Sequence, residues 1–326
     1  MLLDARRPPG TGLPTARTVD HYAFTVPDLE AAVGFFTEVM GGELCYREGP
    51  IQHPDTDWMQ RKLGVHPRAS ARIALVRLGG NCNLELFEYS APDQIATLPA
   101  ESRPGACRLT WWVRDTTTAR AWLARHDIAV EDGDQHGDGT FSTPWGMPCT
   151  LREPPHDARP APAGAPATDT GLGVLGLAQA TYTVADLARA TDFFRDVLGS
   201  EPIGAPDPSH ILLRCGPTAV VELRQAQHPL TPAPSNSDIG GHHLAFYVDD
   251  VDAAAHYLAT VEGVHLMGTP ETVTAGPIAG DRWLYFRTPI GLQMEIINLP
   301  DGTLPYERLT TARRATPGNH SWHDRP

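Results

Sequence analysis

Several features are scarce or absent in this sequence of 326 residues, and each narrows the class of protein. It has five cysteines, no two of them spaced as a CxxC pair, so neither a disulfide framework nor a thiolate zinc site is indicated. No apolar run approaches the roughly 18 to 20 residues of a membrane span. Residues 1–18 are polar and proline-rich, unlike a signal peptide. We therefore expect a protein of the cytoplasm with no membrane partner.

Positive charge is also in short supply. The chain has 26 lysine and arginine residues against 39 aspartate and glutamate residues, which gives a formal net charge of −13. The basic residues form no run or stripe that could follow a phosphate backbone. We therefore expect no nucleic-acid partner.

Hydrophobic residues are plentiful, at 41% of the chain. A chain of this length is near twice the size of a typical domain, so it can bury more than one core. Two globular domains are the simplest expectation. Residues 154–171 have the composition of a linker, and the polar, proline-containing tail beyond Pro300 is expected to be partly disordered.

One strand–helix element occurs four times. In each copy an alternating apolar pattern predicts a strand, and an aspartate two positions later can cap a helix with inward-facing apolar residues. The same spacing in four copies indicates an internal repeat. The strands cover residues 21–26, 108–113, 179–184 and 243–248, and the aspartates are Asp28, Asp115, Asp186 and Asp250.

Each copy also closes with a predicted strand near its end, at residues 83–89, 148–153, 219–224 and 292–297. The chain is therefore predicted to be an α+β protein of four βαβββ modules. Their predicted bounds are 18–95 for module 1, 104–155 for module 2, 173–228 for module 3 and 238–299 for module 4.

Ionisable side chains recur at equivalent positions of these modules. On the first strand of module 4, His243 faces away from the apolar side, and on its last strand Glu295 does the same. His21 and Glu85 are their counterparts in module 1. Modules 2 and 3 carry other residues at these positions, namely Arg108, Thr150, Gln179 and Glu222.

With these positions in view, residues 18–299 resemble the vicinal oxygen chelate superfamily, which includes glyoxalase I, extradiol dioxygenases and bleomycin-resistance proteins. The resemblance implies that pairs of modules form cupped, incomplete barrels. It also implies that the first and last strands of a pair supply the ligands of one divalent metal ion. His21, Glu85, His243 and Glu295 match those ligand positions.

Two module pairings are compatible with the sequence. In a nested pairing, modules 1 and 4 form the metal-binding domain with all four of these ligands, and modules 2 and 3 form a companion domain. In a tandem pairing, modules 3 and 4 would bind the metal through Gln179, Glu222, His243 and Glu295. We favour nesting, because the segments after Glu88 and before His243 resemble the two ends of one linker in two-module relatives.

Two imidazoles and two carboxylates suit a divalent Fe, Ni, Co, Mn or Zn ion and leave positions open for two substrate oxygens. We predict a glyoxalase-like lyase or isomerase that transfers protons on a small-molecule substrate, with Glu85 as the base. An Fe(II) dioxygenase that uses His21, His243 and Glu295 is the alternative. Residues 284–291 resemble the closing signature of extradiol dioxygenases, which makes Tyr285 a second catalytic candidate.

A function of a different class is also compatible with the fold. A metal-free drug-binding protein of the bleomycin-resistance type would use the same cup without turnover. Intact metal ligands argue against this hypothesis, because sequestration requires none. The oligomeric state is left open between monomer and homodimer.

Overall fold

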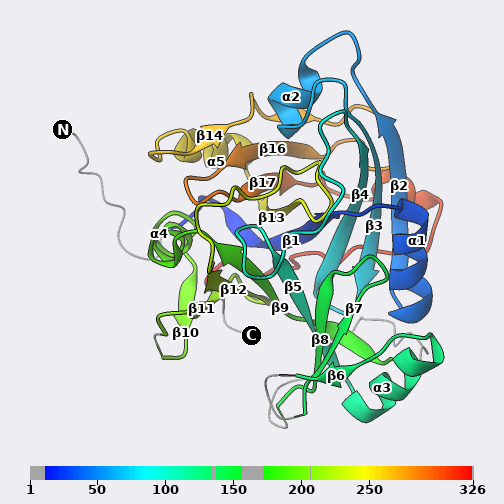
Figure 1. Ribbon diagram of the computed structural model, residues 1–326. Helices are drawn as coiled ribbons and strands as arrows, with labels where there is room; N and C mark the ends of the chain where they lie inside the picture. Colours follow the sequence, from blue (N-terminus) through cyan, green and yellow to red (C-terminus); the bar gives the residue numbers. More distant parts are fainter. Residues whose placement is uncertain (1–11, 134–136, 156–171, 206, 325–326) are drawn as a thin grey trace.

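Two mixed β-sheets carry the fold, as Figure 1 shows in the computed structural model, which describes residues 12–133, 137–155, 172–205 and 207–324. One sheet has nine strands and the other has eight, and the helices are few and short. The predicted α+β class is therefore confirmed. No helix in these ranges is long and apolar enough to cross a membrane.

The first sheet combines strands from the beginning and the end of the chain. Its order is β14-β16-β17-β13-β1-β4-β3-β2, with β15 paired to β16. The two halves meet where β1 and β13 run antiparallel. Its strands are β1 (Ala16–Thr25), β2 (Glu43–Ile51), β3 (Ser70–Leu78), β4 (Cys82–Ser90), β13 (His242–Val248), β14 (His265–Leu266), β15 (Glu271–Thr272), β16 (Arg282–Arg287) and β17 (Gln293–Asn298).

The second sheet is built from the middle of the chain. Its order is β10-β11-β12-β9-β5-β8-β7-β6, and its halves meet at the antiparallel pair of β5 and β9. Strands of consecutive modules 1 and 2 therefore lie in different sheets. Its strands are β5 (Cys107–Val113), β6 (Glu131–Asp132), β7 (Gly139–Ser142), β8 (Pro148–Arg152), β9 (Val174–Val184), β10 (Glu201–Ile203), β11 (His210–Cys215) and β12 (Ala219–Gln225).

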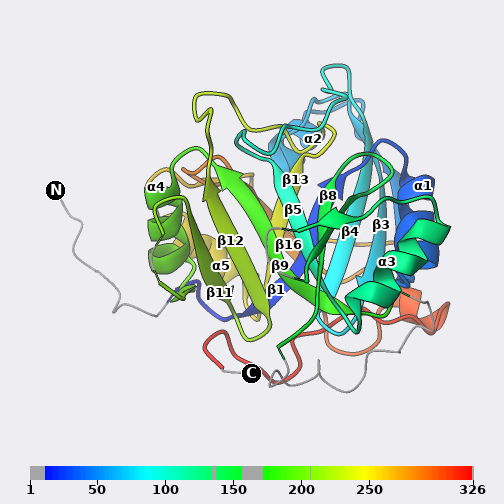
Figure 2. The same ribbon diagram turned by 60° about the horizontal axis from the view of Figure 1, so that its bottom comes forward.

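The repeated aspartates cap four helices, as predicted. The side chain of each accepts a hydrogen bond from the backbone N–H three residues later, which satisfies a donor that the first helical turn leaves free. Helices α3 and α4 lie at opposite edges of the second sheet (Figure 2). The capped helices are α1 (Leu29–Gly34), α3 (Thr116–Arg125), α4 (Leu187–Asp192) and α5 (Val251–Leu258).

Four further helical segments complete the fold. Two π-helical turns continue α1 and α4 at equivalent points of modules 1 and 3, which is another trace of the repeat. The segments are η1 (Phe35–Val39), α2 (Trp58–Leu63), η2 (Phe193–Val197) and the 3-10 helix η3 (Pro305–Arg308).

One continuous hydrophobic core joins the two sheets. It contains Phe36 and Phe246 from the modules of the first sheet and Trp111 from a module of the second, all of them fully buried. Because this core spans both sheets, each sheet buries its apolar face against the other and the helices. The inner face of the first sheet carries two smaller apolar clusters, one around Ile73 and one around Leu75.

The C-terminal tail differs from its prediction. Partial disorder was expected beyond Pro300, yet residues 301–324 are described and pack against the first sheet. Tyr306, Arg314 and Trp322 are buried there, at 2, 4 and 6% exposure. The prediction from composition was wrong because a few buried side chains anchor an otherwise polar segment. The predicted linker, 154–171, falls almost entirely outside the described residues.

Candidate metal centre

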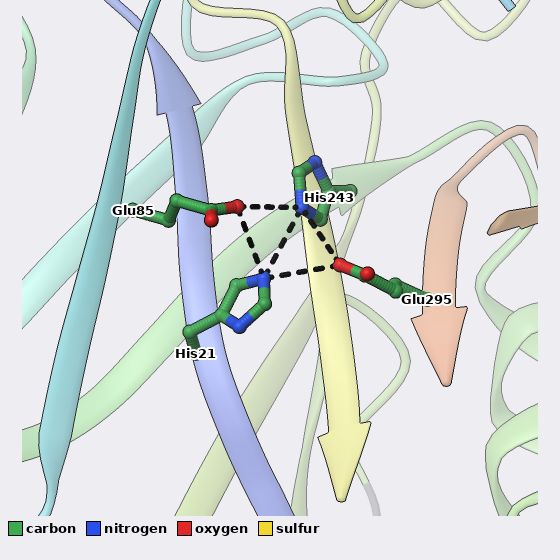
Figure 3. A group of neighbouring side chains, drawn as sticks. All are labelled: His21, Glu85, His243 and Glu295. Atoms are coloured by element: carbon green, nitrogen blue, oxygen red, sulfur yellow. Dashed lines mark hydrogen bonds and ion pairs between the residues drawn. The ribbon is translucent and has the colours of Figure 1, made fainter. Parts of the chain in front are cut away.

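Four ionisable side chains meet on the inner face of the first sheet. His21 lies on β1 and Glu85 on β4, while His243 lies on β13 and Glu295 on β17. These strands are neighbours in the order β17-β13-β1-β4. Ala245 on β13 pairs with both His21 and Glu295, which fixes the register of the group. Figure 3 shows the four side chains converging on one point.

The donor atoms are spaced like the ligands of one ion. The Nε2 atoms of His21 and His243 are 3.3 Å apart. Glu295 Oε2 lies 3.2 and 3.4 Å from these two nitrogens, and Glu85 Oε2 lies 3.3 and 3.5 Å from them. An ion at about 2.0–2.2 Å from each ligand separates neighbouring ligand atoms by roughly 3 to 3.5 Å. The observed spacing therefore suits a single metal ion.

Outer hydrogen bonds aim both imidazoles into the cluster. His21 Nδ1 is 2.8 Å from Asp20 Oδ1, and His243 Nδ1 is 3.4 Å from Asn236 Oδ1. Because both partners are oxygen acceptors, each Nδ1 donates a proton and each Nε2 is turned toward the other ligands. Glu295 Oε2 is buried and accepts no hydrogen bond from the described residues. The residues present thus fit a cation, since a buried carboxylate oxygen needs a positive partner.

The electrostatics of the cluster favour positive charge. Burial alone would lower the pKa of His21, but the charge of Glu85, the hydrogen bond with Asp20 and the close contacts with both glutamates raise it well above its ordinary value. Burial alone would raise the pKa of Glu85, but His21 and then His243 hold it well below its usual range. The Glu85 carboxylate therefore stays ionised and attracts a cation.

Tyr285 stands directly beside the cluster. Its hydroxyl is 3.1 Å from His243 Nε2, and it lies opposite Glu295 in the strand pair β16–β17. Burial, followed by the charges of Glu295 and Glu85, raises the pKa of Tyr285 well above its ordinary value, so the side chain stays a neutral hydroxyl. Because β16 lies beyond β17 on one side of the histidine-bearing strands and β4 lies on the other side, Tyr285 and Glu85 approach the centre from opposite sides.

Helix α2 lies at the upper edge of the first sheet in Figure 1. Its Leu63 packs in the same apolar cluster as Tyr285. Lys62 Nζ donates to the carbonyl of Thr269 at 2.7 Å, and Gln293 Nε2 donates to the carbonyl of Leu63 at 3.2 Å. These bonds tie a helix of module 1 to module 4. The four side chains of the cluster are all less than 9% exposed.

The second sheet uses its equivalent polar residues differently. Glu222 accepts hydrogen bonds from Thr181 Oγ1 at 2.7 Å, from Gln179 Nε2 at 3.0 Å and from Arg224 Nε at 3.0 Å. Arg108 donates to Thr150 Oγ1 at 3.2 Å. Their polar atoms bond one another, and within the described residues the group of four at the first sheet is the one spaced for a metal ion.

Sequence reasoning missed the residues that support the centre. Asp20 precedes His21, so strict alternation would point it away, but a register shift of β1 between Val19 and His21 lets it reach the ring. Asn236 lies in a loop and left no periodic signal. Glu48, paired with Ile73 on the inner face, has its pKa raised to about 7 by burial and by the charge of Glu85.

Comparisons with known proteins show the family of this chain. Residues 20–142 and 176–296 each match the family described as the Glyoxalase/Bleomycin resistance protein/Dioxygenase superfamily. Over 315 residues the chain is 33% identical to a 2-epi-5-epi-valiolone epimerase from Actinomyces sp., a match that covers 97% of this chain and 96% of that protein.

Solved structures show the same fold. A putative dioxygenase from Bacillus subtilis subsp. subtilis str. 168 is similar with a TM-score of 0.60 at 15% identity, over 96% of this chain and 93% of that one. Glyoxalase I from Zea mays is similar with a TM-score of 0.57 at 18% identity, over 86 and 92%. Two regions of the chain match the family, and the epimerase from Actinomyces sp. is 33% identical over 97% of the chain. The chain therefore belongs to the glyoxalase/bleomycin resistance protein/dioxygenase superfamily.

Proposed function

We propose that this protein is a divalent-metal-dependent epimerase that inverts a carbon next to the carbonyl group of a small hydroxyketone. The observation that carries the proposal is the buried cluster of His21, Glu85, His243 and Glu295, with its donor atoms within 4.8 Å of one another. The epimerase relative supports an isomerase over the other chemistries of the superfamily.

The proposal extends to the organisation of the chain. Residues 18–95 and 238–299 would together form the metal-binding domain, and residues 104–155 and 173–228 a companion domain without a metal. The composition of the two sheets supports this division, because β1 and β13 bring the ligand-bearing strands together. The satisfied hydrogen bonds of Glu222 support a structural role for the companion.

A divalent ion held by the four side chains would act as a Lewis acid that polarises a carbonyl chelated together with the adjacent hydroxyl group. The C–H bond of the hydroxyl-bearing carbon next to that carbonyl would then be acidified. Glu85 is ionised and lies at the centre, so it accepts the proton. Tyr285 holds its proton on the opposite side and donates it to the other face of the carbon. Removal and return on opposite faces inverts the configuration, and proton exchange with solvent after product release restores Glu85 and Tyr285 to their starting states.

The surroundings suit such a step. Phe87 and Tyr89 belong to one apolar cluster with Tyr285, and Lys62 ties helix α2 to module 4. Apolar walls of this kind would keep water away from the reacting carbon. The substrate would enter when α2 moves aside, as covering segments do in many enzymes. Small size and several oxygen atoms are therefore the properties that we expect of the substrate.

The name of the epimerase relative makes the substrate class more specific. That protein is named for 2-epi-5-epi-valiolone, a cyclohexanone with several hydroxyl groups. A ketone with a hydroxyl on the neighbouring carbon offers the two oxygens that the proposed centre would chelate. We therefore propose a polyhydroxylated cyclic ketone as the substrate of this protein.

Anaerobic purification followed by metal analysis and a turnover assay tests the proposal. With 2-epi-5-epi-valiolone in D₂O, we expect about one metal ion per chain, conversion to the epimer, and deuterium on the carbon next to the carbonyl. Iron together with oxygen uptake would instead identify a dioxygenase. A metal-free protein that retains a ligand without turnover would identify a drug-binding protein.

A further inference from the structure

The C-terminal segment 304–315 packs against the inner face of the first sheet, close to the proposed metal ligands. Leu304 and Tyr306 belong to the same buried cluster as Tyr46 and Leu75. The rings of Tyr46 and Tyr306 are 5.4 Å apart. Leu75 is the residue that pairs with Glu85 across β3 and β4. The segment therefore forms part of the wall next to the proposed site.

Asn83 fastens this segment to the strand that carries His21. Its Oδ1 accepts a hydrogen bond from the backbone N–H of Ala315 at 2.8 Å, and its Nδ2 donates to the Ala315 carbonyl at 2.9 Å. The same Nδ2 donates to the backbone carbonyl of Asp20 at 2.8 Å. One buried amide thus joins β4, the tail and the residue that precedes His21.

Arg314 reaches further into the same place. It is 4% exposed, and its Nη2 donates to Asp20 Oδ1. That oxygen is also the one that lies 2.8 Å from His21 Nδ1. Asp20 Oδ2 has no hydrogen-bond partner among the described residues. A single carboxylate oxygen therefore connects a residue of the tail to the imidazole of His21, 293 positions away by residue number.

The connection is a rigid one. Both partners of the ion pair are almost fully buried, so neither side chain can find water if the other is removed. Without Arg314, the Asp20 carboxylate could turn either oxygen toward the ring, and the orientation of His21 would no longer be fixed. Hydrogen bonds to the second nitrogen of a ligand histidine set the direction of its metal-binding lone pair.

We infer that Arg314 is a positioning residue of the metal site, which acts through Asp20 on the ring of His21. The C-terminal segment then contributes to metal binding as well as to the fold of the metal-binding domain. The inference rests on the proposed function, because that proposal makes His21 a metal ligand. A purely structural role would stabilise the fold without affecting metal affinity.

The test compares Arg314→Met with Arg313→Met in the full-length chain. Arg313 is half-exposed and bonds carbonyls within the tail, so its variant changes charge and length without touching Asp20. Zn(II) affinity is measured by competition with a chelator, and the unfolding temperature of the metal-free protein is measured alongside. Arg314→Met should weaken Zn(II) binding by about 10- to 100-fold, whereas Arg313→Met should stay within about twofold.

A folded Arg314→Met variant with wild-type Zn(II) affinity would overturn the inference, whatever its unfolding temperature. If that variant does not fold, Arg314→Lys decides in the same way. Lysine keeps the charge but lacks the planar guanidinium, so Zn(II) binding should weaken by roughly tenfold.

A measurement without metal separates this inference from the proposed function. The Nδ1–H signal of His21 is followed by ¹⁵N NMR of the metal-free protein and assigned with His21→Gln. It should shift or broaden in Arg314→Met and stay unchanged in Arg313→Met. If the wild type binds no Zn(II), the proposed function fails, and the NMR signal alone decides on Arg314. An unchanged signal in Arg314→Met would overturn the positioning role.

Discussion

Two equivalent glutamates provide a matched test of the metal centre. Glu295 is on the last strand of module 4 and Glu222 on the last strand of module 3. Glu295 Oε2 is buried without a hydrogen-bond partner among the described residues, whereas Glu222 is held by Thr181, Gln179 and Arg224. Replacement by alanine should therefore have opposite consequences, with metal lost in one variant and stability lost in the other.

The magnitudes follow from those contacts. Four-ligand zinc sites bind with about 10 to 16 kcal/mol, so one ligand accounts for about 3 kcal/mol, which is roughly a 100-fold loss of affinity. Glu295→Ala should lose at least that much. Glu222→Ala leaves the buried Thr181 hydroxyl without its acceptor, which costs about 1–3 kcal/mol of folding free energy. Arg224 is half-exposed and can turn to water, so it adds little.

Chelator competition with Zn(II) and urea unfolding of the metal-free protein give the two readouts for each variant. We expect Glu295→Ala to lower metal affinity, and Glu222→Ala to lower stability with wild-type affinity. His21→Ala should behave like Glu295→Ala. The reverse pattern, in which Glu222→Ala loses the metal and His21→Ala keeps it, would refute the proposed site and move it to modules 3 and 4.

Three further predictions concern neighbouring residues. Tyr285→Phe should lower kcat by about 10²- to 10⁴-fold with unchanged metal content, because only the proton donor is lost; an unchanged kcat would exclude Tyr285 from proton transfer. Lys62→Met removes the hydrogen bond to Thr269 and the ion pair with Glu271, which together contribute about 1 kcal/mol. Amide hydrogen exchange in α2 should therefore accelerate by roughly fivefold. An unchanged exchange rate would show that these two contacts do not stabilise the position of α2. Burial raises the pKa of the Asp281 carboxyl to about 8. The folded protein therefore binds a proton on Asp281 more tightly than the unfolded chain does, and it loses stability as the pH rises from about 4 to 8. The stability advantage of Asp281→Asn over the wild type in urea unfolding should therefore grow from pH 5 to pH 7, and a constant difference would contradict the buried, unpaired carboxyl.

Local features of the sequence predicted the elements well. Alternating strands and capping aspartates depend on residues close together in the chain, and the four caps form as expected, Asp28 with the N–H of Ala31 among them. The closing strands agree with their predicted ranges to within one or two residues. The four ionisable positions were found in the same way, from equivalent places in a repeat. The family resemblance made them candidate ligands, and the structure brings them together.

The tail and the supporting residues show where this reasoning stops. Arg314 and Asn236 carry no periodic signal, because their partners lie 294 and 7 positions away and are reached through loops. Asp20 reaches the ring of His21 through a register shift in β1, which a strictly alternating strand pattern does not predict. Glu48 looks like any polar strand residue until the cup brings the charge of Glu85 near it.

The sequence by itself determined the four modules, their α+β character and the residue types at each equivalent position. Hydrophobic periodicity and capping act over a few residues, so they can be read from the chain. The sequence favoured the nested pairing but left the tandem one open, because every module offers a similar first strand for pairing. Which modules share a sheet is therefore a property of the tertiary structure. In the structure β1 pairs with β13 and β5 with β9. Backbone hydrogen bonds between strands more than 200 residues apart therefore bring His21 to His243, and their shared core holds them there.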